Sequence, residues 1–194
     1  MTVHKKLRLA LLAGGKSGER EVSLKGAEGV INALDLQKYE IKRYDPATDM
    51  AKLANDSPEL DAAFILLHGL FGEDGTVQGF LDLLNLPYQG SGVLGSALAM
   101  DKDMAKTLYT VNGLPVPNWA MVSLADAANP GILVKQLGLP LVVKPVRQGS
   151  SLGMSIARSE IDLAAGIRQA FEYDREVMVE CFVKGREITV GILG

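Results

Sequence analysis

The chain has 194 residues, of which 47% are hydrophobic, 22% charged and 6% aromatic. This composition is typical of a globular protein with a buried core, and it excludes a disordered chain, a collagen and a small disulfide scaffold. Twenty Lys and Arg residues against 23 Asp and Glu residues give a formal net charge of −3, and no long run of like charge suggests a nucleic-acid-binding tail.

Membrane and secretion signals are weak in this sequence. No uncharged apolar run reaches the roughly 18 residues of a membrane-spanning helix. Cys181 is the single cysteine and has no partner for an internal disulfide. The amino terminus, Met-Thr-Val-His-Lys-Lys, leads into a short apolar run without a cleavage site of small residues. We therefore expect a cytoplasmic protein.

Short apolar runs alternate with amphipathic stretches along the first half of the chain. This alternation predicts an α/β fold with an open parallel sheet of Rossmann-like type. The expected strands are residues 7–13, 39–44 and 62–67, with a short strand around 87–88. The expected helices are residues 21–34, 76–84 and 94–111.

A helix stop and a rigid extended segment, Gly113-Leu114-Pro115-Val116-Pro117, interrupt the pattern. We therefore expect one domain at residues 1–113 and a second, of α+β type, at residues 114–194. The second has expected helices at 124–137 and 161–173 and expected strands at 141–145, 154–157 and 177–182. A last strand is expected to begin at Glu187 and to be still running at Gly194, which suggests that this domain is incomplete.

The glycine loop after the first strand is the first candidate site. Gly14-Gly15-Lys16-Ser17 resembles a phosphate loop, but a Walker A motif requires glycine at position 10, where this chain has Ala10. The G-x-G-x-x-G spacing is also absent, and a tight turn without a ligand is an alternative. Glu19-Arg20-Glu21 follows at a helix start, where open α/β sheets place ligands. A carboxylate there can bind a substrate ammonium group.

His68 ends an apolar strand, where histidine is more often a hydrogen-bonded core residue than a catalyst. Three glycines keep the backbone open in the segment that it begins, His-Gly-Leu-Phe-Gly-Glu-Asp-Gly. The helix that starts at Thr76 presents free amide groups, which suit an anion. We interpret Glu73 and Asp74 as caps of that helix.

Lys144 ends another apolar strand, where the simpler interpretation is a lysine that extends to solvent at a sheet edge. Gly149-Ser150-Ser151-Leu152-Gly153 follows within a few residues. This loop supplies backbone amides, two hydroxyls and flexible glycines, which suit a polyphosphate. A lysine beside such a loop indicates a nucleotide site.

For two further pairs of residues, the sequence leaves open whether they bind a nucleotide or have no ligand. Lys102 and Lys106 lie one helical turn apart and are equally consistent with a solvated helix face. Glu180 and Glu187 flank the segment 181–185, a hinge that suits a purine and a ribose. Carboxylates at strand ends are nevertheless common by chance.

Six motifs occur in one order along the chain. They are Glu-Arg-Glu-Val-Ser at 19–23, His-Gly-Leu-Phe-Gly-Glu-Asp-Gly at 68–75, Gly-Ser-Gly-Val at 90–93, Met-Asp-Lys at 100–102, Val-Lys-Pro at 143–145 and Gly-Ser-Ser-Leu-Gly-Met-Ser at 149–155. In this order they resemble the D-alanine:D-alanine ligases, enzymes of the ATP-grasp superfamily. Several motifs are weak alone, but their joint order is specific and covers nearly the whole chain.

The resemblance implies roles for the residues of the first half. Glu19 would bind the ammonium group of the first D-alanine, with Val22 and His68 also in the substrate site and His68 near the carboxylate. Ser150 would hydrogen-bond to Glu19, so that Glu19 and Ser150 are the expected catalytic residues. Residues 1–113 would form the substrate-binding, pre-ATP-grasp domain.

The resemblance also implies an ATP site and places residues 114–194 in the first part of the ATP-grasp domain. The lysines and serines would lie at the phosphates, Glu180 and the backbone of the two residues after Cys181 at the adenine, and Glu187 at the ribose. The expected ATP-binding residues are Lys102, Lys144, Ser150, Ser151, Glu180, Phe182, Val183 and Glu187.

The implied reaction joins two D-alanine molecules through an acylphosphate and uses ATP, for peptidoglycan precursor synthesis. Mg²⁺ or Mn²⁺ is the implied metal, with ligands expected beyond residue 194 and none within this chain. The implied assembly is a homodimer, without nucleic-acid or membrane partners. The 194-residue chain alone is expected to have little or no ligase activity.

Two alternatives stay open at this point. The first is a D-alanine:D-lactate type ligase, which this sequence does not distinguish because the loop that selects the second substrate is expected beyond residue 194. A non-catalytic nucleotide-binding module would bind ATP without any response to D-alanine.

Overall fold

The structure is a computed structural model that describes residues 5–191 and divides them into two units. Unit 1 comprises the residues through Leu108 together with Arg147–Ser150, and unit 2 comprises Tyr109–Val146 and the residues from Ser151 onward. The interpretation of the amino terminus rests partly on residues 1–4, which lie outside the described residues. The predicted division at residue 113 concerns ligase domains and stays a prediction.

A parallel sheet in the order β2-β1-β3 forms the centre of unit 1. Its strands are β1 (Leu7–Leu12), β2 (Tyr39–Tyr44) and β3 (Ala62–Ile65). In register, Leu7 lies beside Tyr39, and Leu9 lies beside Ala62. The short strand expected at 87–88 is an isolated parallel bridge from Tyr88 to β3. All three carboxyl ends therefore lie at one edge of the sheet.

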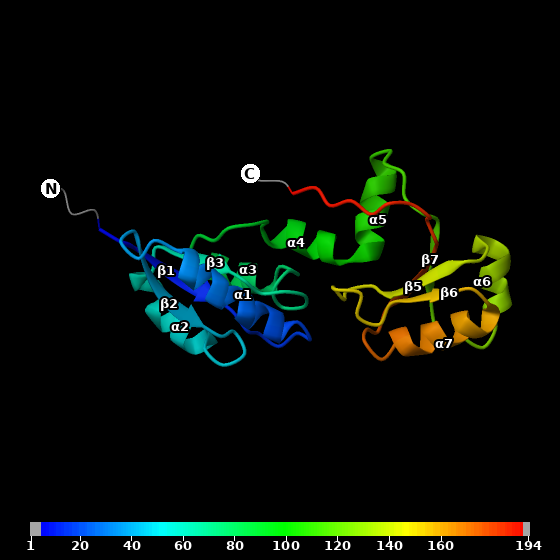
Figure 1. Cartoon of the computed structure of the whole chain (residues 1–194), viewed down its shortest axis with the longest axis horizontal. Helices are drawn as coiled ribbons and strands as arrows, with labels where there is room; N and C mark the ends of the chain where they lie inside the picture. The colour runs from blue at the N-terminus through cyan, green and yellow to red at the C-terminus, as the bar shows by residue number, and fades with distance from the viewer. Residues whose placement is uncertain (1–4, 192–194) are drawn as a thin grey trace. The chain divides into compact units, whose positions relative to one another are not determined.

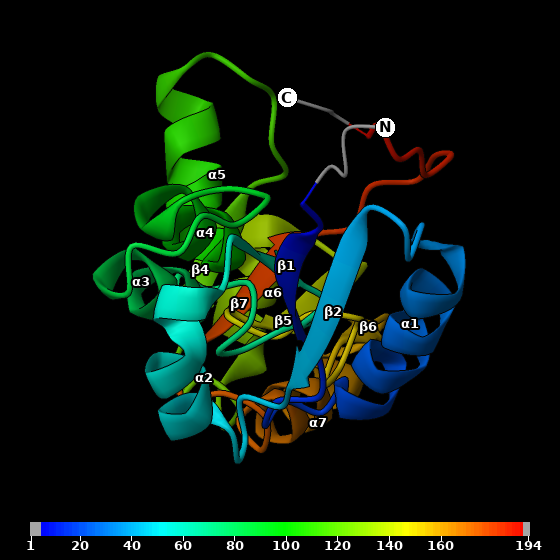
Figure 2. The same ribbon diagram turned by 90° about the vertical axis from the view of Figure 1, so that its left-hand side faces the viewer.

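Helices cover both faces of this sheet, with α1 on one face and α2 and α3 on the other (Figure 2). They are α1 (Arg20–Ala33), α2 (Met50–Asp56), the 3-10 turn η1 (Ser57–Glu59) and α3 (Thr76–Leu83). Leu11 of β1 packs with Ala27 of α1, whereas Leu12 packs with Leu53 of α2 and Leu81 of α3. Because neighbouring strand residues point to opposite faces, β1 is buried on both sides from Leu9 to Leu12, where it is apolar.

The prediction of a single helix at residues 94–111 is wrong. The structure has α4 (Val93–Met100) and α5 (Lys102–Val111), and the chain turns between them at Asp101 (Figure 1). Asp101 has an extended backbone, with φ −83° and ψ 105°. Its Oδ1 accepts a hydrogen bond of 3.0 Å from the amide of Met104 and so caps the first turn of α5. No glycine or proline marks this break in the sequence.

Unit 2 contains an antiparallel sheet in the order β4-β7-β5-β6. Its elements are β4 (Trp119–Val122), α6 (Pro130–Leu137), β5 (Leu141–Pro145), β6 (Ser155–Ala157), α7 (Glu160–Ala170) and β7 (Val177–Cys181). Both helices pack on one face of the sheet, where Leu133 and Ile167 join Val143 and Val179 in the core. The predicted fold class, an open parallel sheet followed by an α+β unit, is confirmed.

Two predictions for unit 2 were wrong. The helix expected at 124–137 begins only at Pro130, because the preceding residues form turns in which the amide of Ser123 donates to Asp126 at 2.8 Å. The strand expected from Glu187 is absent from residues 187–191, which have no neighbouring strand among the described residues to pair with their backbone groups. Gly194, the expected end of that strand, lies outside the described residues.

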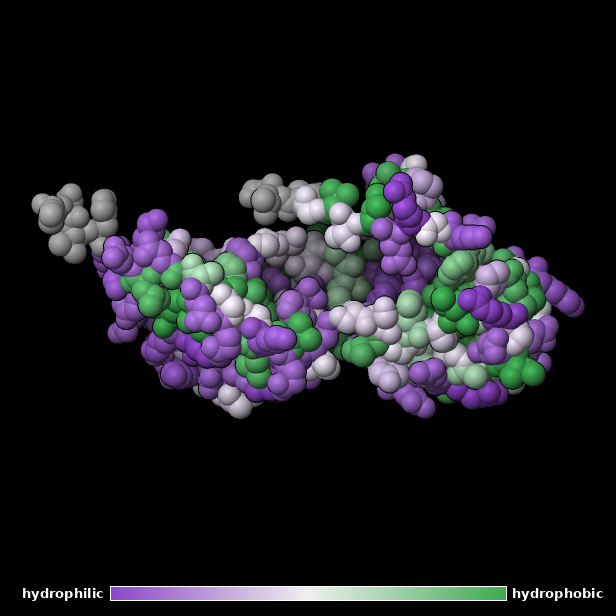
Figure 3. All heavy atoms as spheres, viewed as in Figure 1, coloured by the Kyte–Doolittle hydropathy of each residue, from purple (hydrophilic) through white to green (hydrophobic). Residues whose placement is uncertain are grey.

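The surface of each unit mixes hydrophilic and hydrophobic residues in the view of Figure 3. Within residues 5–191, every helix is too short or too polar to span a membrane.

Gly166 of α7 provides a test of the packing in unit 2. A Cβ atom at Gly166 would overlap Oγ of Ser155 and would lie 3.2 Å from Cγ2 of Val143. We expect Gly166→Ala to lower the free energy of unfolding of unit 2 by about 1–3 kcal/mol. Urea unfolding followed by the fluorescence of Trp119, the single tryptophan, measures this change.

Gly26→Ala is the matched control, because a Cβ atom at Gly26 of α1 meets nothing within 4 Å. It should raise the free energy of unfolding by up to about 1 kcal/mol, measured by circular dichroism. Adding Ser155→Ala to the Gly166→Ala chain should restore part of the loss, since Oγ of Ser155 has no hydrogen-bond partner among the described residues. A Gly166→Ala chain as stable as its parent would contradict this packing.

Candidate functional site

The loop after β1 depends on two glycines with left-handed backbones. Gly14 has φ 99° and Gly15 has φ 81°, values that side chains other than glycine rarely adopt. A Cβ atom at Gly14 would also lie 2.7 Å from Oδ2 of Asp45. Glycine is therefore favoured at Gly15 by its backbone, and at Gly14 both by its backbone and by the close approach of Asp45 from the end of the neighbouring strand β2.

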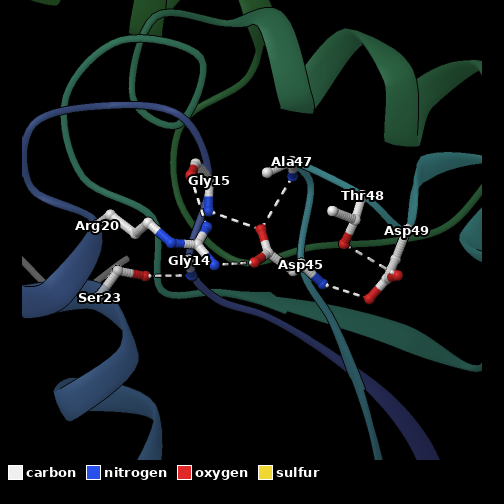
Figure 4. Close-up of polar contacts among 8 residues, drawn as sticks. All are labelled: Gly14, Gly15, Arg20, Ser23, Asp45, Ala47, Thr48 and Asp49. Carbon is white, nitrogen blue, oxygen red and sulfur yellow. Dashed lines mark hydrogen bonds and ion pairs between the residues drawn. The ribbon is translucent and has the colours of Figure 1, made fainter.

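Asp45 holds this loop through both of its carboxylate oxygens (Figure 4). Oδ1 accepts hydrogen bonds of 2.9 Å from the amides of Gly15 and Ala47. Oδ2 pairs with Nη2 of Arg20 at 2.5 Å, and Nη1 of Arg20 donates to the carbonyl of Gly15 at 2.8 Å. The hydrogen bond from Arg20, followed by the backbone bonds, lowers the pKa of Asp45 to about 2. Asp45 is thus ionised at neutral pH.

Two serines join the loops after β1 and β3. The buried hydroxyl of Ser23 accepts from the amide of Gly14 at 2.8 Å and donates to the carbonyl of Leu66. The hydroxyl of Ser17 donates to the carbonyl of His68 at 2.7 Å. The segment that carries His68 is therefore tied to the segment that leads into Glu19.

Glu19 directly precedes α1, and its side chain does not cap that helix. Its carboxylate instead accepts a hydrogen bond from Oγ of Ser150. Oε2 lies over the backbone of two glycines: a Cβ atom would be 2.6 Å away at Gly69 and 3.0 Å away at Gly149. The structure of unit 1 therefore brings together Glu19, Ser150 and the residue after His68. A carboxylate in this position can accept charge-assisted hydrogen bonds from an ammonium group.

His68 is half-buried and lines a cavity of about 290 Å³ in unit 1. The cavity lies among the loops after the three strands, and apolar side chains predominate in its lining. Its lining residues are Gly14, Gly15, Lys16, Ser17, Pro46, Met50, Leu67, His68, Leu70, Phe71, Gly72, Thr76, Val77 and Phe80. Such a mostly apolar pocket with a few polar groups has the character of a small-molecule site. Val22, the other predicted substrate residue, is exposed on α1.

Lys102 is the first residue of α5, and its Nζ donates to the carbonyl of Gln148 at 2.6 Å. Ser150 lies two residues further along the same segment, which folds with unit 1. The structure therefore places both Lys102 and Glu19 in contact with one short segment, 147–150.

Lys144 and Glu180 form an ion pair between the neighbouring strands β5 and β7 of unit 2. Glu180 is buried, and Lys144 is half-buried. The amide of Phe182 donates to the carbonyl of Pro140 at 3.1 Å, which fixes the chain just after β7. The structure thus brings Lys144 to Glu180 and places Phe182 directly after the same strand.

The other predicted nucleotide residues, Ser151, Val183 and Glu187, are exposed. Val183 and Glu187 lie after β7 in a segment without a helix or strand. Ser151 is exposed, and its carbonyl accepts a hydrogen bond of 3.1 Å from the amide of Met154. Contacts of these three residues with a nucleotide stay a prediction.

The two acidic residues before α3 differ in their contacts. Asp74 accepts a hydrogen bond of 3.0 Å from the amide of Thr76, the first residue of the helix, as expected of a capping residue. Glu73 accepts from the amide of Gly69 at 2.7 Å and so closes the loop after His68. The interpretation of Glu73 as a helix cap is therefore wrong.

The residues 5–191 contain no group of three or more His, Cys, Asp and Glu side chains that could hold a metal ion. The metal ligands expected beyond residue 194 stay a prediction.

Sequence reasoning missed the residues that hold the loops in place, above all Asp45 and Ser23. One signal was available for Asp45, because it ends the strand beside the glycine loop and the carboxyl ends of parallel strands share one edge. Ser23 carries no such signal, since a serine in the first turns of a helix is ordinary.

Two family models match the chain. The model described as "D-ala D-ala ligase N-terminus" matches residues 45–91, and the model described as "D-ala D-ala ligase C-terminus" matches residues 108–194.

Individual relatives agree with these matches. A D-alanine–D-alanine ligase of Desulfotalea psychrophila is 58% identical over 190 residues, which are 97% of this chain and 59% of that protein. The crystal structure of a D-alanine–D-alanine ligase from Bacillus anthracis aligns with a TM-score of 0.82 and 38% identity, over 92% of this chain and 58% of that one. The same ligase complexed with ATP aligns with a TM-score of 0.81 and 36% identity, over 92% and 60%. This chain thus spans about three fifths of these relatives.

The ion pair of Asp45 with Arg20 predicts a pH-dependent contribution to stability. We expect Asp45→Asn to lower the free energy of unfolding by about 1 kcal/mol at pH 7. Because folding lowers the pKa of Asp45 from 3.8 to about 2, this contribution is complete above about pH 5 and is lost as the pH falls toward 2. Urea unfolding at pH 7, 5 and 3 should show equal differences between parent and variant at pH 7 and 5 and a smaller difference at pH 3.

Glu28→Gln is the control, since it removes the charge from an arginine–carboxylate pair with Arg43 in which the carboxylate side chain is 60% exposed, against 20% for Asp45. It should change the stability little at any of these pH values. A stability difference for Asp45→Asn that stays constant down to pH 3 would contradict the role of the ionised carboxylate.

Proposed function

Because this chain belongs to the D-alanine–D-alanine ligase family, we propose that its protein joins two D-alanine molecules, with ATP, into D-alanyl-D-alanine for peptidoglycan synthesis. The observation that carries the proposal is the contact of Glu19 with Ser150 beside the His68 segment in unit 1. The chain spans 59% of its curated relative, so the activity is proposed for the whole protein.

Unit 1 would bind the first D-alanine. The carboxylate of Glu19 would accept hydrogen bonds from the ammonium group of the substrate, while Ser150 keeps the carboxylate in place. His68 lines a cavity that is large enough for an amino acid, and its carbonyl is fixed by Ser17. Val22, in the first turn of α1 and three residues after Glu19, would contact the methyl group of the substrate.

Lysine and serine side chains would bind the phosphates of ATP. Lys102 would donate to the phosphates, as a cation already directed by Gln148. Lys144 would do the same, and Ser150 and Ser151 would cover the phosphates. The supporting observation is that the Bacillus anthracis ligase, whose structure holds ATP, shares this fold.

The base and the sugar of ATP would bind at the end of β7. Glu180 would accept from the amino group of the adenine, and the backbone of Phe182 and Val183 would complete its recognition. Glu187 would accept from the ribose hydroxyls. Mg²⁺ or Mn²⁺, when bound by residues outside the described part of the chain, would neutralise phosphate charge.

Two displacements account for the reaction. A carboxylate oxygen of the first D-alanine attacks the γ-phosphorus, and ADP leaves, which gives an acylphosphate. The amine of the second D-alanine attacks the acyl carbon, loses a proton, and inorganic phosphate leaves. The two lysines would stabilise the negative charge that moves between the phosphates, and the serine loop would keep water from the acylphosphate.

We further propose that residues 1–113 act as the substrate-binding domain and residues 114–194 as the first part of the ATP-grasp domain. We also propose that the whole protein forms a homodimer and lies in the cytoplasm.

Glu19→Gln in the full-length protein tests the amino-acid site. The variant keeps the shape of the side chain and its hydrogen bond with Ser150 but removes the charge. We expect the KM for D-alanine to rise at least about 30-fold, because a charge-assisted bond is lost, while the Kd for ATP changes less than about twofold. Phosphate release and equilibrium ATP binding, both with Mg²⁺, measure the two quantities.

Glu21→Gln, two residues away and exposed on α1, is the matched control and should leave both quantities unchanged. A full-length parent that binds ATP but shows no response to D-alanine would contradict the proposal and favour a non-catalytic nucleotide-binding module.

Lys144→Met tests the nucleotide site of unit 2. Loss of the ammonium group should raise the Kd for ATP at least about tenfold, and Lys135→Met, at an exposed position of α6, should not. Because Lys144→Met leaves the buried Glu180 unpaired, urea unfolding of the same variant, measured beside ATP binding, distinguishes lost binding from lost folding. Equal ATP affinity in parent and Lys144→Met chains would contradict the assignment.

A further inference from the structure

We propose that Asp101 and Arg147 are positioning residues that hold the segment 147–150 in the conformation in which it meets Lys102 and Glu19. The inference deepens the proposed function, on which its consequence for ATP binding rests. Neither residue is expected to touch the nucleotide.

Two close contacts join Arg147 to Asp101. Nε and Nη2 of Arg147 both donate to Oδ2 of Asp101, at 2.9 and 2.8 Å. The side chain of Asp101 is 13% exposed, and that of Arg147 is 31% exposed. Two charge-assisted hydrogen bonds to a largely buried oxygen are stronger than a surface ion pair, because less solvent screens them.

Asp101 has a second partner that connects the pair with Lys102. Its Oδ1 accepts from the amide of Met104 at 3.0 Å, and its carbonyl accepts from the amide of Ala105 at 2.8 Å. These bonds define the start of α5, whose first residue is Lys102. One carboxylate oxygen of Asp101 thus fixes the start of the helix that carries Lys102, and the other oxygen fixes the position of Arg147.

The segment 147–150 has no helix or strand of its own to maintain its shape. Ser150, at its end, has a left-handed backbone with φ 49°, which is unfavourable for a residue other than glycine. Its contacts with unit 1 include the pair with Asp101, the bond from Lys102 to the carbonyl of Gln148 and the bond from Ser150 to Glu19. Side-chain contacts therefore hold the conformation that regular hydrogen bonding does not.

A different role for Arg147, direct contact with a phosphate, makes an opposite prediction. If Asp101 only neutralised a phosphate-binding arginine, Asp101→Asn would free positive charge and tighten ATP binding. If the two residues position the segment, Asp101→Asn and Arg147→Met would each weaken ATP binding. The sign of the Asp101→Asn effect therefore separates the two roles.

The experiment compares Arg147→Met, Asp101→Asn and the double variant, with two measurements on the full chain. We expect the backbone ¹⁵N order parameters of residues 148–150 to fall from about 0.85 to below about 0.6 in each variant. The Kd for ATP, with Mg²⁺, should rise about five- to tenfold in each single variant. The double variant should be no worse than either, because both changes remove the same contact.

Arg8→Met is the matched control. Arg8 pairs with Asp61 elsewhere in unit 1 at 2.9 Å, and its side chain is 31% exposed, as is that of Arg147. This variant should leave the order parameters of 148–150 and the Kd for ATP unchanged, whatever it does to stability. Arg147→Lys, which keeps the charge, should restore part of the ATP affinity that Arg147→Met loses.

Unchanged order parameters in Arg147→Met, or tighter ATP binding by Asp101→Asn, would overturn the inference. A parent chain that binds no ATP would instead refute the proposed function, and the order parameters would still decide whether the pair holds the segment.

Discussion

The ion pair between Arg20 and Asp45 is the interaction on which the site of unit 1 depends. Three parallel strands end at one edge, and their loops have no common hydrogen-bonding pattern to align them. Asp45, at the end of β2, binds the glycine loop after β1 through Gly15 and through Arg20. Glu19 directly precedes Arg20, so a shift of this pair would move the carboxylate that is proposed to bind the substrate amine. The low pKa of Asp45 reflects how strongly the folded state uses its charge.

A similar ion pair occurs at three cationic residues of the candidate site. A carboxylate with little solvent access holds a basic side chain: Asp45 holds Arg20, Asp101 holds Arg147, and Glu180 holds Lys144. An unpaired cation on a mobile side chain loses conformational entropy when it binds an anion. Pairing lowers that cost for Lys144, the one of these three cations that is proposed to touch a phosphate. The other two carboxylates hold arginines that position loops.

Elements with a strong local pattern were predicted well. The strands 39–44 and 141–145 coincide with β2 and β5, because the first alternates apolar with charged side chains and the second begins with a continuous apolar run. The break at Asp101 was missed, since a single extended residue leaves the helical spacing of the apolar side chains almost intact. Helix α2 was missed as well, and the strand expected from Glu187 is not a strand in residues 187–191, where an apolar run has no strand to pair with.

The sequence by itself determined the fold class, the order of the motifs and, through that order, the family. It also marked Glu19, His68, Lys144 and the serine loop as chemically useful, because residue type and position at a strand end are local properties. Only the tertiary structure decided which carboxylate holds which cation. Arg20 and Asp45 are 25 residues apart, and Asp101 and Arg147 are 46 residues apart. Sequence periodicity does not predict such pairs. Arg20 meets Asp45 because the sheet brings two loops to the same edge, and Arg147 meets Asp101 because its segment folds back on the start of α5.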